Sequence, residues 1–148
     1  MVARTPPSDP SEAETPEPRL KVLVVDDHPL NRKMVEAMLS QFGAEVSLAV
    51  DGDEACRRFR AGAFDLVLMD VQMPVMDGLA ATRAIRAMEA ELGWPRTPIL
   101  MLTANTLPEH VRASHEAGAD RHLAKPIQLT ALTDAVQRAT GSLQSAWG

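Results

Sequence analysis

The chain has 148 residues, 45% of them apolar, a formal net charge of −5 at pH 7 and one cysteine, Cys56. This length fits one domain with a buried core. The negative charge argues against nonspecific nucleic-acid binding, and a lone cysteine excludes an intrachain disulfide. No apolar run approaches the roughly 20 residues of a transmembrane helix, and the amino terminus has no secretory signal. We therefore expect no membrane insertion and a cytoplasmic location.

Three regions differ in composition. Residues 1–19 are rich in Pro, Glu, Ser and Thr, which predicts a disordered arm or linker. Residues 20–140 carry the apolar patterns of a folded domain, and residues 141–148 are expected to form a flexible tail.

The folded region alternates short apolar runs with segments of helical spacing. Strands are predicted at 21–25, 44–50, 65–69, 99–102 and 121–124. Helices are predicted to follow at 29–42, 52–61, 79–92, 106–117 and 129–139. Such alternation predicts a parallel α/β sheet with helices on both faces.

The fourth predicted helix has weak signals. Thr106 and Glu109 have the spacing of a capping box, which predicts its start, and Gly118 ends it. Its large apolar residues are few, chiefly Leu107 and Val111, so we expect a weakly anchored and mobile helix.

Polar residues follow the predicted strands at their carboxyl ends. In a parallel sheet these ends share one edge, where ligand chemistry is usually found. The edge is expected to collect Asp26, Asp27, Asp70, Thr103 and Lys125.

This set of residues predicts phosphoryl transfer to a carboxylate. Two unit charges ~4 Å apart repel by about 4 kcal/mol at an effective dielectric near 20, and a divalent cation would relieve that repulsion. Oxygen ligands with few protein contacts favour Mg²⁺. Lys125 supplies a point charge for a phosphoryl oxygen, Thr103 a hydroxyl donor, and Asp70 a nucleophile that needs no general base.

Four stretches in order, VLVVDDHPLNR, DLVLMDVQMPVMDG, ILMLTA and ADRHLAKP, resemble the receiver domain of two-component response regulators. The resemblance covers residues 20 to about 140. It implies the flavodoxin-like receiver fold, a five-stranded parallel sheet in the order 2-1-3-4-5. The segment Asn31-Arg32-Lys33 is similar to receivers of hybrid histidine kinases.

The resemblance also implies roles for single residues. Asp70 corresponds to the phosphoacceptor, Thr103 to the switch hydroxyl and Lys125 to the lysine that pairs with the phosphoryl group. For Mg²⁺, Asp27 would be a direct ligand, Asp26 would act through water or as a second ligand, and Gln72 would offer its backbone carbonyl. The Lys125–Pro126 peptide bond is often cis in this family.

One position departs from the family pattern. His122 stands where the family usually has Tyr or Phe, an aromatic residue that turns inward as the switch hydroxyl moves. The resemblance implies phosphoryl uptake from a histidine kinase or histidine phosphotransfer protein, and a switch of the 103–125 face. The output partner would be a protein that binds the face formed by 106–117, 121–124 and 129–139, with no nucleic acid involved.

Two other classes of protein use similar parts. A haloacid-dehalogenase-type phosphatase also has a carboxylate nucleophile, but it requires Asp-x-Asp after its first strand, where this chain has Asp26-Asp27-His28. A phosphate-independent interaction module, or a flavin-binding flavodoxin-like domain, would have an unreactive pocket. As a receiver, the chain would catalyse only its own phosphorylation and dephosphorylation and would not be an enzyme. The four histidines lack metal-ligand spacing and are expected to be solvated or to cap helices.

Overall fold

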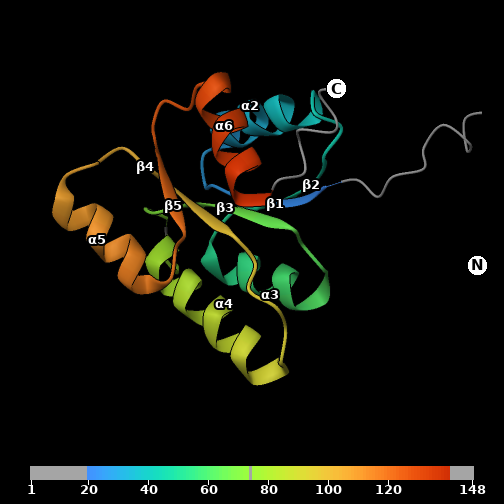
Figure 1. Ribbon diagram of the computed structural model, residues 1–148, viewed down its shortest axis with the longest axis vertical. Helices are drawn as coiled ribbons and strands as arrows, with labels where there is room; N and C mark the ends of the chain where they lie inside the picture. The colour runs from blue at the N-terminus through green and yellow to red at the C-terminus, as the bar shows by residue number, and fades with distance from the viewer. Residues whose placement is uncertain (1–19, 74, 141–148) are drawn as a thin grey trace, which may run out of the picture.

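A computed structural model describes residues 20–73 and 75–140 (Figure 1). The predicted arm at 1–19 and tail at 141–148 lie outside these residues. Five parallel strands form one sheet in the order β2-β1-β3-β4-β5, which confirms the expected fold class and strand order. The strands are β1 (Lys21–Val25), β2 (Glu45–Ala49), β3 (Leu66–Asp70), β4 (Ile99–Thr103) and β5 (Arg121–Ala124).

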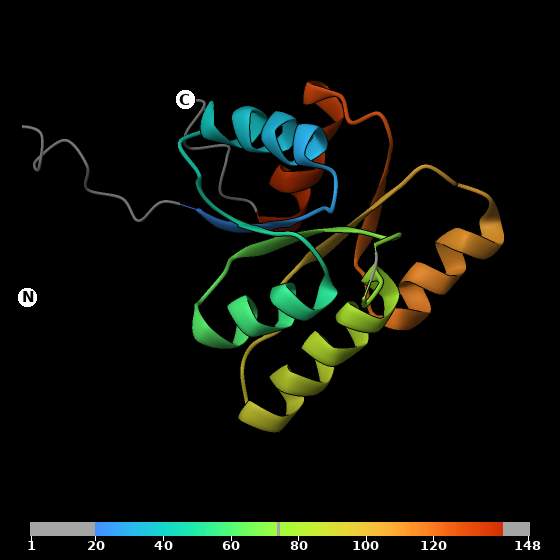
Figure 2. The ribbon, with the colours of Figure 1, turned by 180° about the vertical axis from the view of Figure 1, so that it is seen from behind.

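Helices cover both faces of the sheet, as Figures 1 and 2 show from opposite sides. One face carries α2 and α6, and the other carries α3, α4 and α5. Each strand connects to the next through one helix. The helices are α2 (Pro29–Ser40), α3 (Gly52–Ala61), α4 (Gly78–Leu92), α5 (Pro108–Ala117) and α6 (Leu129–Thr140).

The core divides according to the period of two along each strand. In β1, Val22 and Val24 face the α2–α6 layer, while Leu23 and Val25 face the α3–α4 layer. The central strands β3 and β4 are buried along their whole length. Their continuous apolar runs are typical of parallel strands that are covered on both faces.

The third strand ends one residue later than predicted. It includes Asp70, which pairs in register with Leu102 of β4. The Val71 N–H donates to the Leu102 carbonyl at 3.1 Å. Asp70 is therefore held by the sheet ladder itself, and its backbone has little freedom.

The predicted capping box of the fourth helix was wrong. The N-cap of α5 is Leu107, without a side-chain cap bond, and Pro108 is its first helical residue. The Asn105 side chain instead accepts the Leu107 N–H at 3.0 Å, and a proline in the first turn needs no partner for a backbone donor. The only buried residues of α5 are Ser114 and Ala117, so the expected weak anchoring is confirmed, while its mobility stays a prediction.

Two properties of the described part bear on sequence expectations. The Lys125–Pro126 bond is cis, as the family resemblance implied. Among the described residues, no helix combines the length and the hydropathy that a membrane span requires.

Candidate functional site

Charged side chains from three strands meet at the carboxyl edge of the sheet. Asp70 ends β3, Asp26 follows β1 and Lys125 follows β5. The Lys125 Nζ donates to Asp70 Oδ1 at 2.8 Å and lies 3.6 Å from Asp26 Oδ2. Residues 55 positions apart in the chain thus form a direct ion pair, because the fold brings successive strand ends to one edge.

A cavity of about 330 Å³ opens beside this ion pair. Most of the predicted site residues share it: Asp27, Asp70, Gln72, Thr103 and Lys125. Asp26 lines an adjoining pocket and reaches the cavity through Lys125. His122 does not belong to it, since it lines a separate groove between α5, β5 and α6 with His115 and Arg138.

Burial sets the electrostatics of Asp70. Desolvation raises the pKa of its carboxyl group, and the negative charges of Asp26 and Asp27 act in the same direction. Lys125 opposes this by hydrogen bonding and by its charge, but the net direction is upward. The site therefore holds an excess of negative charge that one lysine compensates only in part.

Asp26 carries an unsatisfied oxygen. It is 1% exposed, and its Oδ1 accepts the His28 N–H at 2.8 Å. Its Oδ2 is buried and accepts no hydrogen bond from any described residue. Such an atom is costly to bury without a partner.

The ligand atoms nearby fit a hard divalent cation. Asp26, Asp27 and His28 each offer one ligand atom, and these atoms lie within 4.8 Å of one another. The carboxylate oxygens are the donors that Mg²⁺ prefers. An ion there would provide a partner for the Asp26 oxygen that accepts no hydrogen bond and would reduce the repulsion among the carboxylates, so the residues present fit Mg²⁺.

Thr103 is tied to the loop that follows β4. Its hydroxyl donates to the Asn105 carbonyl at 2.9 Å and accepts the Asn105 N–H at 2.9 Å. Asn105 in turn accepts the Leu107 N–H, at the N-cap of α5. The hydroxyl in the cavity is thus connected to the start of a helix through two short hydrogen-bonded turns.

The contacts of three residues at the cavity were not predicted from the sequence. Asn105 links Thr103 to α5, and a hint existed, since Asn favours such local turns. His28 and His110 line the cavity, although both were expected to be merely solvated or capping. Nothing in their spacing indicates this, because His110 reaches the cavity from the first turn of α5.

The backbone of Asp70 packs closely against residue 78, which must be a glycine. A Cβ at Gly78 would overlap the Asp70 carbonyl oxygen. The Gly78 N–H donates to the Val71 carbonyl at 2.8 Å and closes the loop between β3 and α4. The absence of a side chain at residue 78 allows this tight closure and keeps the Asp70 backbone in place.

The chain matches a known family of proteins. The model of the response regulator receiver domain matches residues 22–137. The chain therefore belongs to the response regulator receiver domain family, and it is a signalling domain of two-component phosphorelay systems. This membership does not favour the phosphatase or the phosphate-independent module.

Individual relatives agree with this assignment. The sensor protein GacS of Pseudomonas syringae pv. syringae is 46% identical over 121 residues, which is 82% of this chain and 13% of that protein. The receiver domain of sensor histidine kinase PA1611 from Pseudomonas aeruginosa, solved with magnesium in its active site cleft, is 40% identical with a TM-score of 0.76. That match covers 84% of this chain and 100% of the other.

A third match involves a complex. The co-crystal structure of the Saccharomyces cerevisiae phosphotransfer protein Ypd1 with the receiver domain of Ssk1 matches with 27% identity and a TM-score of 0.80. It covers 88% of this chain and 98% of that chain. The chain spans only 13% of the length of the GacS of Pseudomonas syringae and 15% of that of the sensor histidine kinase GacS of Pseudomonas protegens, so it corresponds to a small part of those proteins.

Proposed function

We propose that Asp70 accepts a phosphoryl group from a phosphohistidine on a histidine kinase or histidine phosphotransfer protein. The observation that carries this proposal is the 2.8 Å pair between Lys125 Nζ and Asp70 Oδ1, inside a cavity that also holds Asp27 and Thr103. A carboxylate oxygen of Asp70 forms the new O–P bond. The P–N bond breaks, and its electron pair returns to the histidine ring, so no general base is required.

Asp26, Asp27, Asp70 and the backbone carbonyl of Gln72 would hold a Mg²⁺ ion at this site. When bound, the ion neutralises charge on the phosphoryl oxygens and on the carboxylates. Lys125 holds one oxygen of Asp70 and supplies positive charge to the phosphoryl group. Among the described residues, the other Asp70 oxygen accepts no hydrogen bond and is available as the nucleophile.

Thr103 would connect phosphorylation to conformation. At rest its hydroxyl donates to the Asn105 carbonyl. A phosphoryl oxygen competes for the same proton, and a hydrogen bond to a charged group contributes roughly 1.5–3 kcal/mol. If this bond forms in one conformation only, it shifts a two-state equilibrium about ten- to hundredfold. Loss of the Asn105 contact would release the loop before α5.

The rim of the cavity suits a partner that brings the phosphohistidine. Large apolar side chains from different elements are exposed near this edge, above all Val75 at 84% and Leu30 at 71%. Val75 also has a φ of 70°, a strained value for a β-branched residue. Apolar side chains around a charged centre let a partner bind without covering the reacting groups.

The remaining functional assignments follow from this role. The groove of about 500 Å³ between α5, β5 and α6 would bind a protein output partner, with His122 in place of the usual aromatic switch residue. The domain would catalyse only its own phosphorylation and dephosphorylation. We also propose a cytoplasmic location, with which the single unpaired thiol of Cys56 is compatible.

The decisive experiment is incubation with Mg²⁺ and acetyl phosphate, followed by intact-mass measurement. The wild type should gain the mass of one phosphoryl group, and Asp70→Asn should gain none. Asp53→Asn, an exposed carboxylate on α3 that pairs with Arg57, is the matched control and should gain it like the wild type. A phosphorylated Asp70→Asn variant, or an unmodified wild type, would contradict the proposal.

A further inference from the structure

Helix α5 is attached to the rest of the fold unevenly. Residues 104–110, which include the loop before it and its first turn, are all exposed. Its N-cap, Leu107, makes no side-chain cap bond, and its buried residues, Ser114 and Ala117, lie in the carboxyl half. The amino half of α5 therefore has little that holds it against the sheet.

The carboxyl end of α5 is fixed by several hydrogen bonds. The Gly118 carbonyl accepts from Arg86 Nε at 2.9 Å and from Arg96 Nη2 at 3.0 Å. The Ala119 N–H returns to the Ser114 carbonyl at 3.0 Å. The Asp120 N–H donates to the Ile99 carbonyl at 2.9 Å, so the chain after α5 is fastened to β4 as well.

Arg86 of α4 is the centre of this attachment. Its Nη1 donates to Glu89 at 2.9 and 3.1 Å and to the Thr97 carbonyl at 2.8 Å, and its Nη2 donates to Asp120 at 2.8 Å. The side chains of Arg86 and Glu89 are only 14% and 6% exposed. Removing one partner from such a buried charged network leaves the others unpaired, so the network resists rearrangement.

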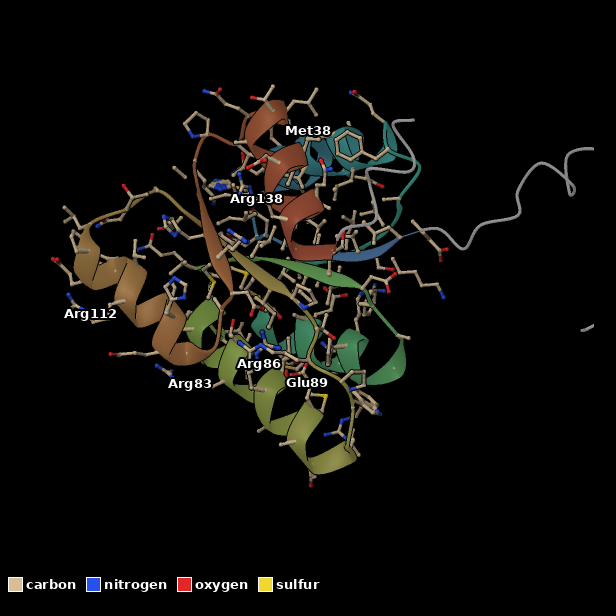
Figure 3. The ribbon with its side chains drawn as sticks, in the orientation of Figure 1. Met38, Arg83, Arg86, Glu89, Arg112 and Arg138 are labelled. Atoms are coloured by element: carbon tan, nitrogen blue, oxygen red, sulfur yellow. The ribbon has the colours of Figure 1, made fainter. Side chains whose placement is uncertain are left out.

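The other arginines nearby are not equivalent. Figure 3 shows Arg86 and Glu89 on α4 beneath the sheet, whereas Arg112 extends from the outer side of α5. Arg83, one turn before Arg86, is exposed and makes no hydrogen bond or ion pair within residues 20–73 and 75–140. Arg86 alone among these three joins α4 to the end of α5.

We infer that Arg86 is a positioning residue that makes the carboxyl end of α5 the fixed side of a hinge. Release of the Thr103–Asn105 contact frees the amino half, which moves relative to residues 114–120 while these stay in place. The trigger rests on the proposed function, but the unequal anchoring does not. The swing would carry His110, and with it one wall of the Asp70 cavity.

The first test uses the full chain without any phosphoryl donor. Amide hydrogen exchange at 115–119 should be about tenfold slower than at 111–113. Arg86→Lys keeps a charge for Glu89 but loses the forked donors, so it should raise exchange at 115–119 about tenfold relative to the β1 amides. Arg83→Lys is the control and should leave the gradient unchanged.

The second test adds Mg²⁺ and beryllofluoride. Within the loop before α5 and α5 itself, changes in exchange should be confined to 104–113 in the wild type, and in Arg86→Lys they should extend through 115–119. Equal changes along α5 in the wild type, or an unaltered gradient in Arg86→Lys, would overturn the hinge. If beryllofluoride causes no change anywhere near Asp70, the proposed function fails, and the first test still decides the hinge.

A second variant protects the test against misfolding. Should Arg86→Lys not fold, Asp120→Asn weakens the ion pairs with Arg86 and Arg96, while the amide oxygen can still accept the Ile99 N–H. It should raise exchange at 115–119 in the same way but to a smaller extent. An acceleration that the β1 amides share equally would count against a specific role in holding α5.

Discussion

At the scale of single residues, the site is defined by charge imbalance. Asp26, Asp27 and Asp70 meet one ammonium group, that of Lys125, and a buried oxygen of Asp26 has no hydrogen-bond donor among the described residues. Such an arrangement costs folding free energy. The cost has a functional counterpart, because the same imbalance attracts a cation and, with it, a phosphoryl group.

The first prediction concerns Asp70 and pH. Because the pKa of Asp70 is raised in the folded state, ionising it disfavours folding, and the associated stability is lost as pH rises through that pKa. Asp70→Asn should therefore have a higher thermal midpoint than the wild type at pH 7 without Mg²⁺. The difference should shrink as pH falls and vanish where Asp70 is protonated in both states.

Thermal melts between pH 3 and pH 7 check this sign, with Asp53→Asn as the control that should follow the wild type closely. A lower midpoint for Asp70→Asn at pH 7 would mean that the attraction of Lys125 outweighs burial and the neighbouring carboxylates.

The sequence was sufficient to predict which side chains form the site, but not how the site is linked to α5. Asp26, Asp27, Asp70, Thr103 and Lys125 could be brought together from the sequence, because strand ends must share an edge in a parallel sheet. The Thr103–Asn105 contact and the presence of His110 in the cavity could not. They depend on the conformation of the loop before α5, which periodicity does not determine.

At the scale of elements, the helices begin by different means. Asp51 accepts the Glu54 N–H at 2.8 Å, and Glu54 accepts the N–H of Val50, the residue before the N-cap, at 2.8 Å, so two side chains hold the start of α3. Asp77 caps α4 in the simpler way, by accepting the Ala80 N–H. Helix α5 lacks a side-chain cap, which agrees with its weak attachment at that end.

The second prediction tests the cap of α3. Asp51→Ala removes the acceptor of the Glu54 N–H and should lower the free energy of unfolding by about 1 kcal/mol, within a range of roughly 0.5–2. Chemical denaturation measures this. Asp53→Ala, exposed on the same turn, should change stability by about 0.5 kcal/mol or less. Equal losses in the two variants would show that the cap contributes nothing specific.

Helix boundaries show where sequence patterns mislead. The start of α3 and α4 at Asp51 and Asp77 could be predicted, because each acid precedes a glycine and an apolar pattern. For α5, Thr106 and Glu109 matched a capping box, yet Pro108 set the start of the helix two residues later. The spacing was right for a cap, but the local loop bonds of Asn105 took precedence.

At the scale of the whole molecule, the two edges of the sheet differ in charge, exposure and bonding. The carboxyl edge combines an excess of negative charge, exposed apolar side chains and the loosely held half of α5. The amino edge is tightly bonded, by the ion pair of Arg86 with Glu89 and by the packed rings of Phe59, Phe64 and Trp94. This division lets one edge change conformation while the other preserves the fold.

The last prediction concerns the metal. Because Mg²⁺ would bind the folded state only, it should raise the stability, by about 2.7 kcal/mol at a concentration 100 times its Kd. Thermal midpoints measured across a Mg²⁺ titration at constant ionic strength check this. Asp27→Asn removes one charged ligand and should therefore lose most of this increase in stability. Because Asp27 is exposed, the substitution should leave the core intact. An undiminished increase in Asp27→Asn would argue against this ligand.

The direction of the strands also determines where a handle or label can be attached without blocking the site. Leu20 precedes the start of β1, and Thr140 ends α6. The start of β1 and the end of α6 both lie toward the edge opposite the carboxyl ends of the strands (Figure 1). Covalent attachments at these two points would leave the acidic rim open to an incoming macromolecule. Affinity handles or fluorophores placed there should therefore report on phosphotransfer encounters without obstructing them.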